Sequence, residues 1–325
     1  MRLAAVTLVM AVAFAQAALS QSRMIEHAYG TAQVSGTPER IVSLSYIGHD
    51  FLLALDVKPI ALRHWYGNFE KAVWPWAEDA LGDADPVILY GGIDIERIAM
   101  LAPDLILAQW SGLTEREYAL LSQIAPTIAH PKGERAYSAS WQQMTRQVGL
   151  AVGREDEAEQ VISDIEDQFE AIRSAHPEWQ SQTAIAILPS RLSAFGARDL
   201  RGRFLQDLGF QFPTAVSGID DFDPNFIRIP HEAIGVVDTD LVVWVDTPDV
   251  NDVLAAIPLR HTMQAFQEGR EIYTDYELTG ALNHSSPLSL PYALDRITPL
   301  IEAATDGNPE TVVPGWTRDG KVIQP

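Results

Sequence analysis

The stretch 93–108 reads IDIERIAMLAPDLILA, and the stretch 229–244 reads IPHEAIGVVDTDLVVW. Without a gap, two isoleucines, a glutamate, an aspartate and a leucine coincide between them. Each stretch reads as a short amphipathic helix, a turn that carries an aspartate, and an apolar run of strand length. A strand that is apolar on both faces is typical of a parallel sheet covered by helices. The two copies therefore predict two similar α/β lobes, although unrelated helix–turn–strand units can share such a pattern.

Apolar runs of strand length alternate with helical patterns along both halves of the chain. Strands are expected at 40–45, 59–62, 105–109, 184–188, 241–245 and 272–274. Helices are expected at 50–55, 204–208 and 291–303. This alternation predicts a doubly wound parallel sheet in each lobe. In such sheets a ligand lies beyond the carboxyl ends of the strands.

The clearest helical pattern is residues 154–175, REDEAEQVISDIEDQFEAIRSA. Apolar residues recur at helical spacing, acids crowd the first turns, and His176-Pro177 ends the pattern. At about 1.5 Å per residue such a helix is about 33 Å long, enough to reach from one lobe to another. Its place between the two copies favours a linker over an ordinary surface helix. We therefore expect an N-terminal lobe at 24–152, an interdomain helix at 153–177 and a C-terminal lobe at 178–325.

Composition excludes several classes of function. The chain has 325 residues, of which 47% are hydrophobic and 21% charged, as in globular proteins. Its net charge of -21 argues against nucleic-acid binding, because no basic surface is available to displace phosphate counterions. The chain contains no cysteine. Disulfides, zinc thiolate sites, iron–sulfur clusters, cysteine nucleophiles and a lipid anchor on cysteine are therefore excluded.

The N-terminus has the pattern of an export signal. Residues 3–14 are almost wholly apolar, and Ala15-Gln16-Ala17 supplies small residues at the spacing that a signal peptidase reads. We expect a signal peptide at 1–17 and a mature protein in the periplasm of a Gram-negative-type cell, with no stable membrane insertion. A membrane anchor is the alternative, but the apolar run is short for the ~20 residues that a bilayer span requires.

Sequence signatures of enzymes are missing. His231-Glu232 begins like the helix of a zinc protease, but Gly235 stands where the second histidine is required. No nucleophile elbow, phosphate-binding loop or dinucleotide fingerprint is present. The histidines are scattered, so no metal site is predicted. We therefore expect no catalytic residues, and the alternative is a secreted hydrolase that uses His49, Asp50 or Glu232.

Aromatic residues and arginines gather at the predicted strand ends. Aromatic rings offer large apolar faces with a polar edge, and arginine offers a planar fork for oxygen-rich groups. Together they suit a bulky, partly polar small molecule, although core packing is the alternative for any single tryptophan. The residues in question are Tyr46, Arg63, Trp65, Tyr66, Trp110, Arg191 and Trp244.

With these features the chain resembles the iron-siderophore and cobalamin family of periplasmic binding proteins of ABC transporters. The likeness runs from residue 40 to about residue 303. Its most specific segments are RIVSLSYIGHDFLLALDVKPIAL (40–62), IERIAMLAPDLILA (95–108), FGARDLRGRFLQDLGF (195–210), EAIGVVDTDLVVW (232–244) and SPLSLPYALD (286–295).

The resemblance implies an interlobe cleft for iron already wrapped in an organic chelator. The protein would then need no cofactor and no metal ligands of its own. It also implies that one glutamate on each lobe contacts an arginine pocket on the transporter's permease subunits, and the matching residues are Glu96 and Glu232. Both also suit helix N-termini by their charge alone. The ligand-binding residues expected are Tyr46, Arg63, Trp65, Tyr66, Trp110, Arg191, Arg198 and Trp244.

The chemical class of the chelator stays open at this point. The set Arg63, Trp65, Trp110 and Trp244 leans toward hydroxamates, whereas Arg191, Arg198, Arg201 and Arg203 keep catecholates open. Cobalamin or haem is the alternative within the same family. Haem would need an axial ligand in the cleft, for which the candidates are Tyr46, Tyr66, His64 and His284.

Overall fold

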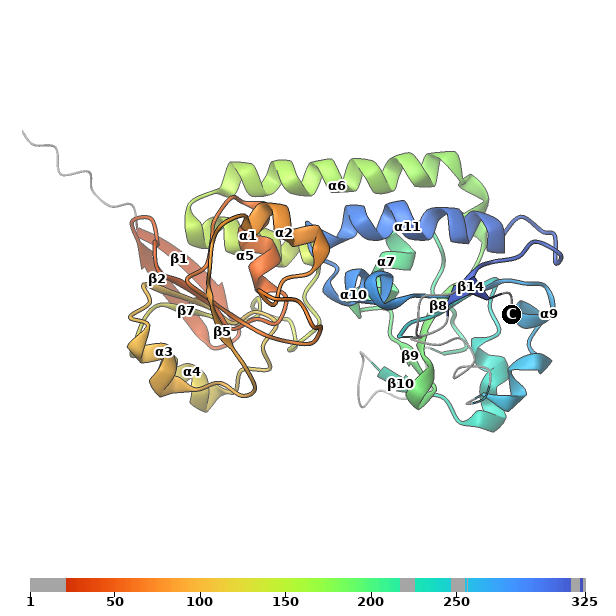
Figure 1. The fold of residues 1–325 in the computed structure, drawn as a ribbon, viewed down its shortest axis with the longest axis horizontal. Helices are drawn as coiled ribbons and strands as arrows, with labels where there is room; N and C mark the ends of the chain where they lie inside the picture. Colours follow the sequence, from red (N-terminus) through yellow and green to blue (C-terminus); the bar gives the residue numbers. More distant parts are fainter. Residues whose placement is uncertain (1–21, 217–225, 247–254, 256, 317–321, 324–325) are drawn as a thin grey trace, which may run out of the picture.

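The structure is a computed structural model that describes residues 22–216, 226–246, 255, 257–316 and 322–323. The expected signal peptide at 1–17 lies outside the described residues. Two lobes, each built on a five-stranded sheet, lie side by side (Figure 1). One helix, α6 (Glu155–Ala175), runs across both of them. The prediction of two α/β lobes joined by a long helix is therefore confirmed.

The N-terminal lobe has a wholly parallel sheet in the order β5-β4-β3-β6-β7. Its strands are β3 (Ile41–Ser43), β4 (Ala61–Arg63), β5 (Val87–Leu89), β6 (Leu105–Leu107) and β7 (Thr127–Ile128). The connecting helices are α1 (Gly48–Ala54), α2 (Pro75–Leu81), α3 (Ile95–Met100), α4 (Glu115–Leu121) and α5 (Trp141–Val152). A hairpin of β1 (Ser22–His27) and β2 (Gly30–Ser35) precedes them and packs on α5. The strand order reverses between β3 and β6, so their carboxyl ends frame a ligand crevice.

The C-terminal lobe has a mixed sheet in the order β10-β9-β8-β11-β12. Three strands are parallel as predicted: β8 (Ala184–Leu188), β11 (Leu241–Trp244) and β12 (Glu271–Tyr273). The two other strands, β9 (Ser193–Phe195) and β10 (Phe226–Arg228), are antiparallel and were not predicted. Only the single turn η2 (Pro189–Arg191) and Leu192 join β8 to β9. A parallel pairing would need a much longer crossover.

Helices complete the C-terminal lobe and the layer beneath α6. They are η1 (Pro177–Ser181), α7 (Leu200–Asp207), η3 (His231–Val237), η4 (Pro258–Thr262), α9 (Gln264–Gln267), α10 (Tyr276–His284) and α11 (Ser289–Ala304). A small hairpin of β13 (Gly315–Trp316) and β14 (Val322–Ile323) follows. No helix in the described ranges is both long enough and apolar enough to cross a membrane.

The repeated stretches occupy equivalent places in the two lobes. The first forms α3 and β6, and the second forms η3 and β11. Their shared aspartates make equivalent contacts: Asp104 accepts hydrogen bonds from the backbone N–H groups of Glu39 and Arg40, just before β3. Asp240 accepts one from the backbone N–H of Thr183, just before β8. Each aspartate thus ties the start of its own strand to the start of the neighbouring first strand.

One continuous apolar core joins the two lobes. It contains Ile41 and Leu105 from the first sheet and Val243 and Ile272 from the second. The buried face of α6 lies within the same core and comprises Ala158, Ile162, Ile165 and Phe169. Because these residues pack together, α6 is a fixed strut and not a flexible linker.

Candidate functional site

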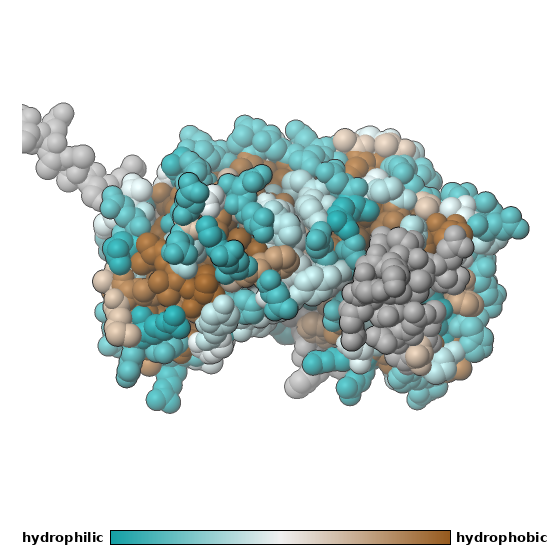
Figure 2. Space-filling model, in the orientation of Figure 1, coloured by the Kyte–Doolittle hydropathy of each residue, from teal (hydrophilic) through white to brown (hydrophobic). Residues whose placement is uncertain are grey.

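A cleft of about 330 Å³ lies between the lobes. Its described lining comes from the N-terminal lobe through Tyr46, Trp65, Trp110 and Tyr137, and from the C-terminal lobe through Asp199, Arg201 and Phe226. Figure 2 shows a notch in the outline between the lobes, on the side away from α6. Tyr46, Trp65 and Trp110 come shortly after the ends of β3, β4 and β6. They meet because the carboxyl ends of parallel strands share one edge of the sheet.

The rings of the N-terminal lobe form an ordered aromatic surface. Tyr46 and Trp65 stack with 5.7 Å between ring centroids, and Trp110 meets Tyr137 edge to face at 5.2 Å. Gly112 permits this arrangement, since a Cβ there would lie 2.3 Å from the Tyr137 hydroxyl oxygen. Burial raises the pKa of Tyr137, with the nearby Tyr46 adding to the rise and Arg63 opposing it. Tyr137 therefore stays a neutral hydroxyl at neutral pH.

Arg63 lies behind Tyr46 and does not itself line the cleft. Its guanidinium carbon is 4.2 Å from the centre of the Tyr46 ring. Its Nε donates to the carbonyl of Gly91 and its Nη1 to the carbonyl of Ser111. The side chain is buried at 7% exposure. Arg63 therefore fixes the Tyr46 ring and adds a positive charge beneath it.

Among the expected and described arginines, Arg201 lines the cleft, and it is paired there with the carboxylate of Asp199. Its Nη2 donates to Oδ2 of Asp199 over 2.9 Å, and its Nε lies 2.8 Å from Oδ1. The guanidinium also stacks on the Phe195 ring, 4.1 Å from its centre. Both charged side chains are buried, with Asp199 at 1% and Arg201 at 6% exposure. Burial lowers the pKa of Arg201, and the Asp199 carboxylate opposes that shift.

Besides Arg63 and Trp244, three of the expected ligand-binding residues lie outside the described lining. The Tyr66 hydroxyl accepts a hydrogen bond from Asn283 over 2.8 Å, and burial raises its pKa. Arg191 is exposed in a separate depression beside Glu232. Arg198 forms an exposed ion pair with Glu134 over 2.7 Å. Tyr66 and Arg198 therefore connect the two lobes in this structure, and Arg191 lies on the surface of one of them.

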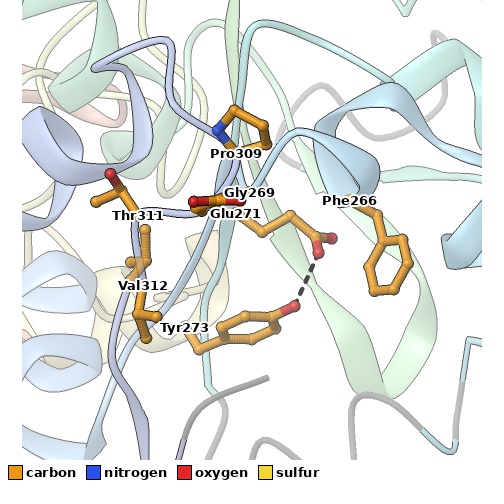
Figure 3. A pocket seen from close by; sticks show the side chains of 9 residues that line it. Phe266, Gly269, Glu271, Tyr273, Pro309, Thr311 and Val312 are labelled. Carbon is orange, nitrogen blue, oxygen red and sulfur yellow. Dashed lines mark hydrogen bonds between the residues drawn. The ribbon is translucent and has the colours of Figure 1, made fainter.

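The expected ligand-binding role of Trp244 needs correction, because this side chain is completely buried in the core of the C-terminal lobe. Its indole N–H donates to Glu271 over 2.8 Å. The same carboxylate accepts hydrogen bonds from Arg260 and Tyr273, the second of which is drawn in Figure 3. Burial raises the pKa of Glu271, and Arg260 is the main opposing influence. Trp244 is thus part of a satisfied buried network and does not face the cleft.

Sequence reasoning missed three cleft residues, Tyr137, Asp199 and Phe226, and named Arg201 only among several candidate arginines. Tyr137 precedes α5 in a loop, Asp199 caps α7, Arg201 is in the first turn of α7, and Phe226 begins the unpredicted strand β10. From the sequence, Arg201 is only one of several arginines in the C-terminal half. An acid at a helix start with an arginine two positions later was the available signal for the Asp199–Arg201 pair.

The residues of the alternative functions are placed differently. His49, Asp50 and His284 are buried at 1% exposure or less and lie outside the described lining of the cleft. Trp76 and Ser286 donate hydrogen bonds to Asp50 over 2.8 and 2.6 Å. Ser286 therefore joins α1 of the N-terminal lobe to the segment between α10 and α11, and Trp76 joins α1 to α2. In the described part of the chain, no group of His, Cys, Asp or Glu is arranged to hold a metal ion.

The expected docking residues Glu96 and Glu232 are both exposed. Glu96 is in the first turn of α3, and Glu232 is in the first turn of η3. In Figure 1, α3 lies at the end of the N-terminal lobe that is farthest from α6. The two carboxylates therefore mark equivalent positions on separate lobes, as the repeat predicts.

Comparison with known proteins agrees with this architecture. Residues 41–278 match the family described as periplasmic binding protein. The chain belongs to this family. A solved periplasmic solute-binding protein from Mycobacterium smegmatis is 32% identical and superposes with a TM-score of 0.77, covering 87% of this chain and 99% of that one. The family resemblance expected from the sequence is thus confirmed.

Two curated relatives carry more specific names. The probable siderophore-binding lipoprotein YfiY of Bacillus subtilis is 28% identical over 201 residues, 60% of this chain and 58% of that protein. The Fe(3+) dicitrate-binding periplasmic protein FecB of Escherichia coli is 29% identical over 201 residues, 60% of this chain and 63% of that protein. The matched region thus spans about three fifths of the length of these two relatives.

Proposed function

We propose that this member of the periplasmic binding protein family is a periplasmic receptor that captures a ferric siderophore and delivers it to an inner-membrane ABC importer. The observation that carries the proposal is the interlobe cleft, which five aromatic residues and one paired arginine line. Such a surface binds a bulky, partly polar molecule by stacking and hydrogen bonding. A chelator that already saturates its iron needs no metal ligand from the protein.

Further support comes from outside the cleft. The names of the two curated relatives include siderophore and ferric dicitrate binding. The apolar stretch and Ala15-Gln16-Ala17 at the N-terminus support export to the periplasm. No catalytic activity is proposed, because the histidine and aspartate of the hydrolase alternative, His49 and Asp50, are buried inside the protein.

A fluorescence panel tests the proposal directly. The purified mature protein is titrated with ferric hydroxamate, catecholate and citrate complexes, haem and cobalamin. A ferric chelate absorbs light, so the true cargo should quench the indoles of Trp65 and Trp110 in a saturable, one-to-one manner. Absence of binding to every iron chelate would contradict the proposal. A shifted Soret band with haem would instead support the haem alternative, and turnover of a test ester or peptide would support a hydrolase.

Transporter docking by Glu96 and Glu232 is tested by charge reversal. Because both carboxylates are exposed and outside the cleft lining, Glu96→Arg and Glu232→Arg should leave the cargo Kd nearly unchanged. Uptake of radiolabelled iron in cells should fall in each variant and fall further in the double variant. Asp167→Arg, on the exposed face of α6, is the control and should transport normally. A roughly tenfold weaker cargo affinity in either glutamate variant would show that the docking role is wrong.

A further inference from the structure

Among the described residues, the charged groups that line the cleft cancel one another. Among the described residues that line it, Asp199 and Arg201 carry formal charge, and the others are tyrosine, tryptophan and phenylalanine. The Asp199 carboxylate contacts Arg201 through both oxygens, at 2.8 and 2.9 Å. Nη2 donates to one oxygen and Nε lies beside the other without a hydrogen bond, so Asp199 occupies the edge of the guanidinium that would otherwise pair with a carboxylate or catecholate of a ligand.

Because the pair is buried, its cancelled charge affects which ligand charges the cleft can accept. Both partners are nearly inaccessible, so solvent screens their charges weakly. A trianionic iron complex entering the cleft would lose its hydration and would meet the Asp199 carboxylate beside the arginine. Charges moved out of water need an opposite charge that is free to pair with them. Arg63, which lies behind the Tyr46 ring, is fixed by the carbonyls of Gly91 and Ser111.

We infer that Asp199 sets the charge selectivity of the cleft, so that the receptor prefers ferric complexes of zero or small net charge, such as neutral trihydroxamates. This inference rests on the proposed siderophore-binding function and names the residue that decides between its cargo classes. Asp199 acts as a positioning residue that neutralises Arg201. It also caps α7, where its Oδ1 accepts a hydrogen bond from the backbone N–H of Arg201 over 2.9 Å.

The variant Asp199→Asn tests the inference with little structural change. Asparagine keeps the capping oxygen and the side-chain volume, but it removes the negative charge and replaces the oxygen that accepts from Nη2 of Arg201 with an amide donor, so the arginine is released from the pair. Dissociation constants are measured by tryptophan quenching for ferrichrome, a neutral trihydroxamate, and for ferric enterobactin and ferric citrate, which are anionic. Wild type should bind ferrichrome more tightly. The variant should shift the ratio of the constants by about tenfold or more toward the anionic complexes, with a steeper salt dependence for them.

Two further variants keep the test decisive. Glu159→Gln removes an equal charge from an ion pair between α6 and α5, with Arg146, and should leave the ratio unchanged. Arg201→Gln leaves Asp199 without its arginine and should shift the ratio the opposite way, further against the anions. It also serves as the test if Asp199→Asn does not fold. An equal loss of affinity for all complexes would assign Asp199 a purely structural role and overturn the inference.

The outcomes for wild type separate the two proposals. Tighter binding of ferric enterobactin or ferric citrate than of ferrichrome would overturn the charge selectivity and leave the siderophore receptor intact. Failure to bind any of the iron complexes would overturn the proposed function itself.

Discussion

At the scale of single residues, two tryptophans that look alike in the sequence have opposite roles. Trp65 follows the strand β4 and Trp244 ends the strand β11, and both strands pair in parallel with their neighbours. Yet Trp65 is half-buried at the cleft and Trp244 is fully buried in the core. Replacing them should therefore separate affinity from stability.

Trp65→Ala should weaken binding of the true cargo by roughly threefold to tenfold, since a stacked ring contributes ~0.5–1.5 kcal/mol beyond its buried area. Its melting temperature should change little. Trp244→Phe should keep the cargo Kd and lose about 1–3 kcal/mol of stability, because the Glu271 carboxylate loses one of its donors. Titration and urea denaturation of both variants give the comparison. Equal affinity losses in the two variants would show that the cleft is wrongly placed.

His284 should make stability fall in mild acid. Burial lowers its pKa to about 4, with the nearby Asp50 opposing the shift and His49 adding to it. The unfolded chain binds this proton near pH 6.5, whereas the folded protein does not until about pH 4. The contribution of uncharged His284 to the free energy of unfolding is therefore fully present above pH 6.5, and it is lost progressively as the pH falls toward 4.

The variant His284→Gln removes this titration. The stability gap between wild type and variant, measured by urea denaturation, should therefore shrink between pH 7 and pH 4.5. Asp207 titrates with the opposite sign, since burial raises its pKa to about 6, and His27 with the same sign, since burial lowers its pKa to about 4. Both contributions cancel in the difference between the two proteins. A gap that stays constant with pH would contradict the assignment.

At the scale of elements, α6 is held in place by close packing against α5 in the N-terminal lobe and α7 in the C-terminal lobe. The helix packs on α5 through Gly149, where an added Cβ would lie 2.5 Å from Cβ of Ala158 and 3.0 Å from the carbonyl oxygen of Arg154. Glycine at this position lets the two helices approach, although it is a weak helix former. On the other lobe, Phe169 of α6 meets Phe204 of α7 edge to face at 5.6 Å.

Gly149→Ala should destabilise the protein by about 1–3 kcal/mol, because backbone and side chain must shift to admit the methyl group. Gly235→Ala in η3 is the matched control, since a Cβ added there would meet no atom within 4 Å. That control should change stability by no more than about 0.5 kcal/mol. Urea denaturation measures both. Equal effects at the two glycines would show that α5 and α6 are not in close contact.

At the scale of the whole molecule, the lobes should close little when cargo binds. The apolar core runs through both lobes and α6, and Ser286 ties the C-terminal segment to Asp50 of the N-terminal lobe. A packed helix does not absorb the large backbone changes that loop hinges allow. Small-angle scattering curves with and without cargo should nearly superimpose. A large fall in the radius of gyration on binding would defeat this expectation.

The sequence by itself determined the two lobes, the long helix between them and the strand ends at which Tyr46, Trp65 and Trp110 reach the cleft. These follow from local periodicity, because helices, buried strands and the edge of a parallel sheet each leave a pattern in neighbouring residues. The repeat also located Glu96 and Glu232 at equivalent exposed positions.

Only the tertiary structure decided which side chains face the ligand. Strands buried on both faces show no polar alternation, so the sequence could not tell that Trp244 points into the core. Tyr137 and Phe226 come from a loop and from an antiparallel edge strand, and no local pattern brings them to the cleft. The Asp199–Arg201 pair is local in sequence, but its place opposite the aromatic rings exists only once the second lobe packs against the first. Such contacts join residues that are far apart in the chain, so the local spacing of residues does not predict them.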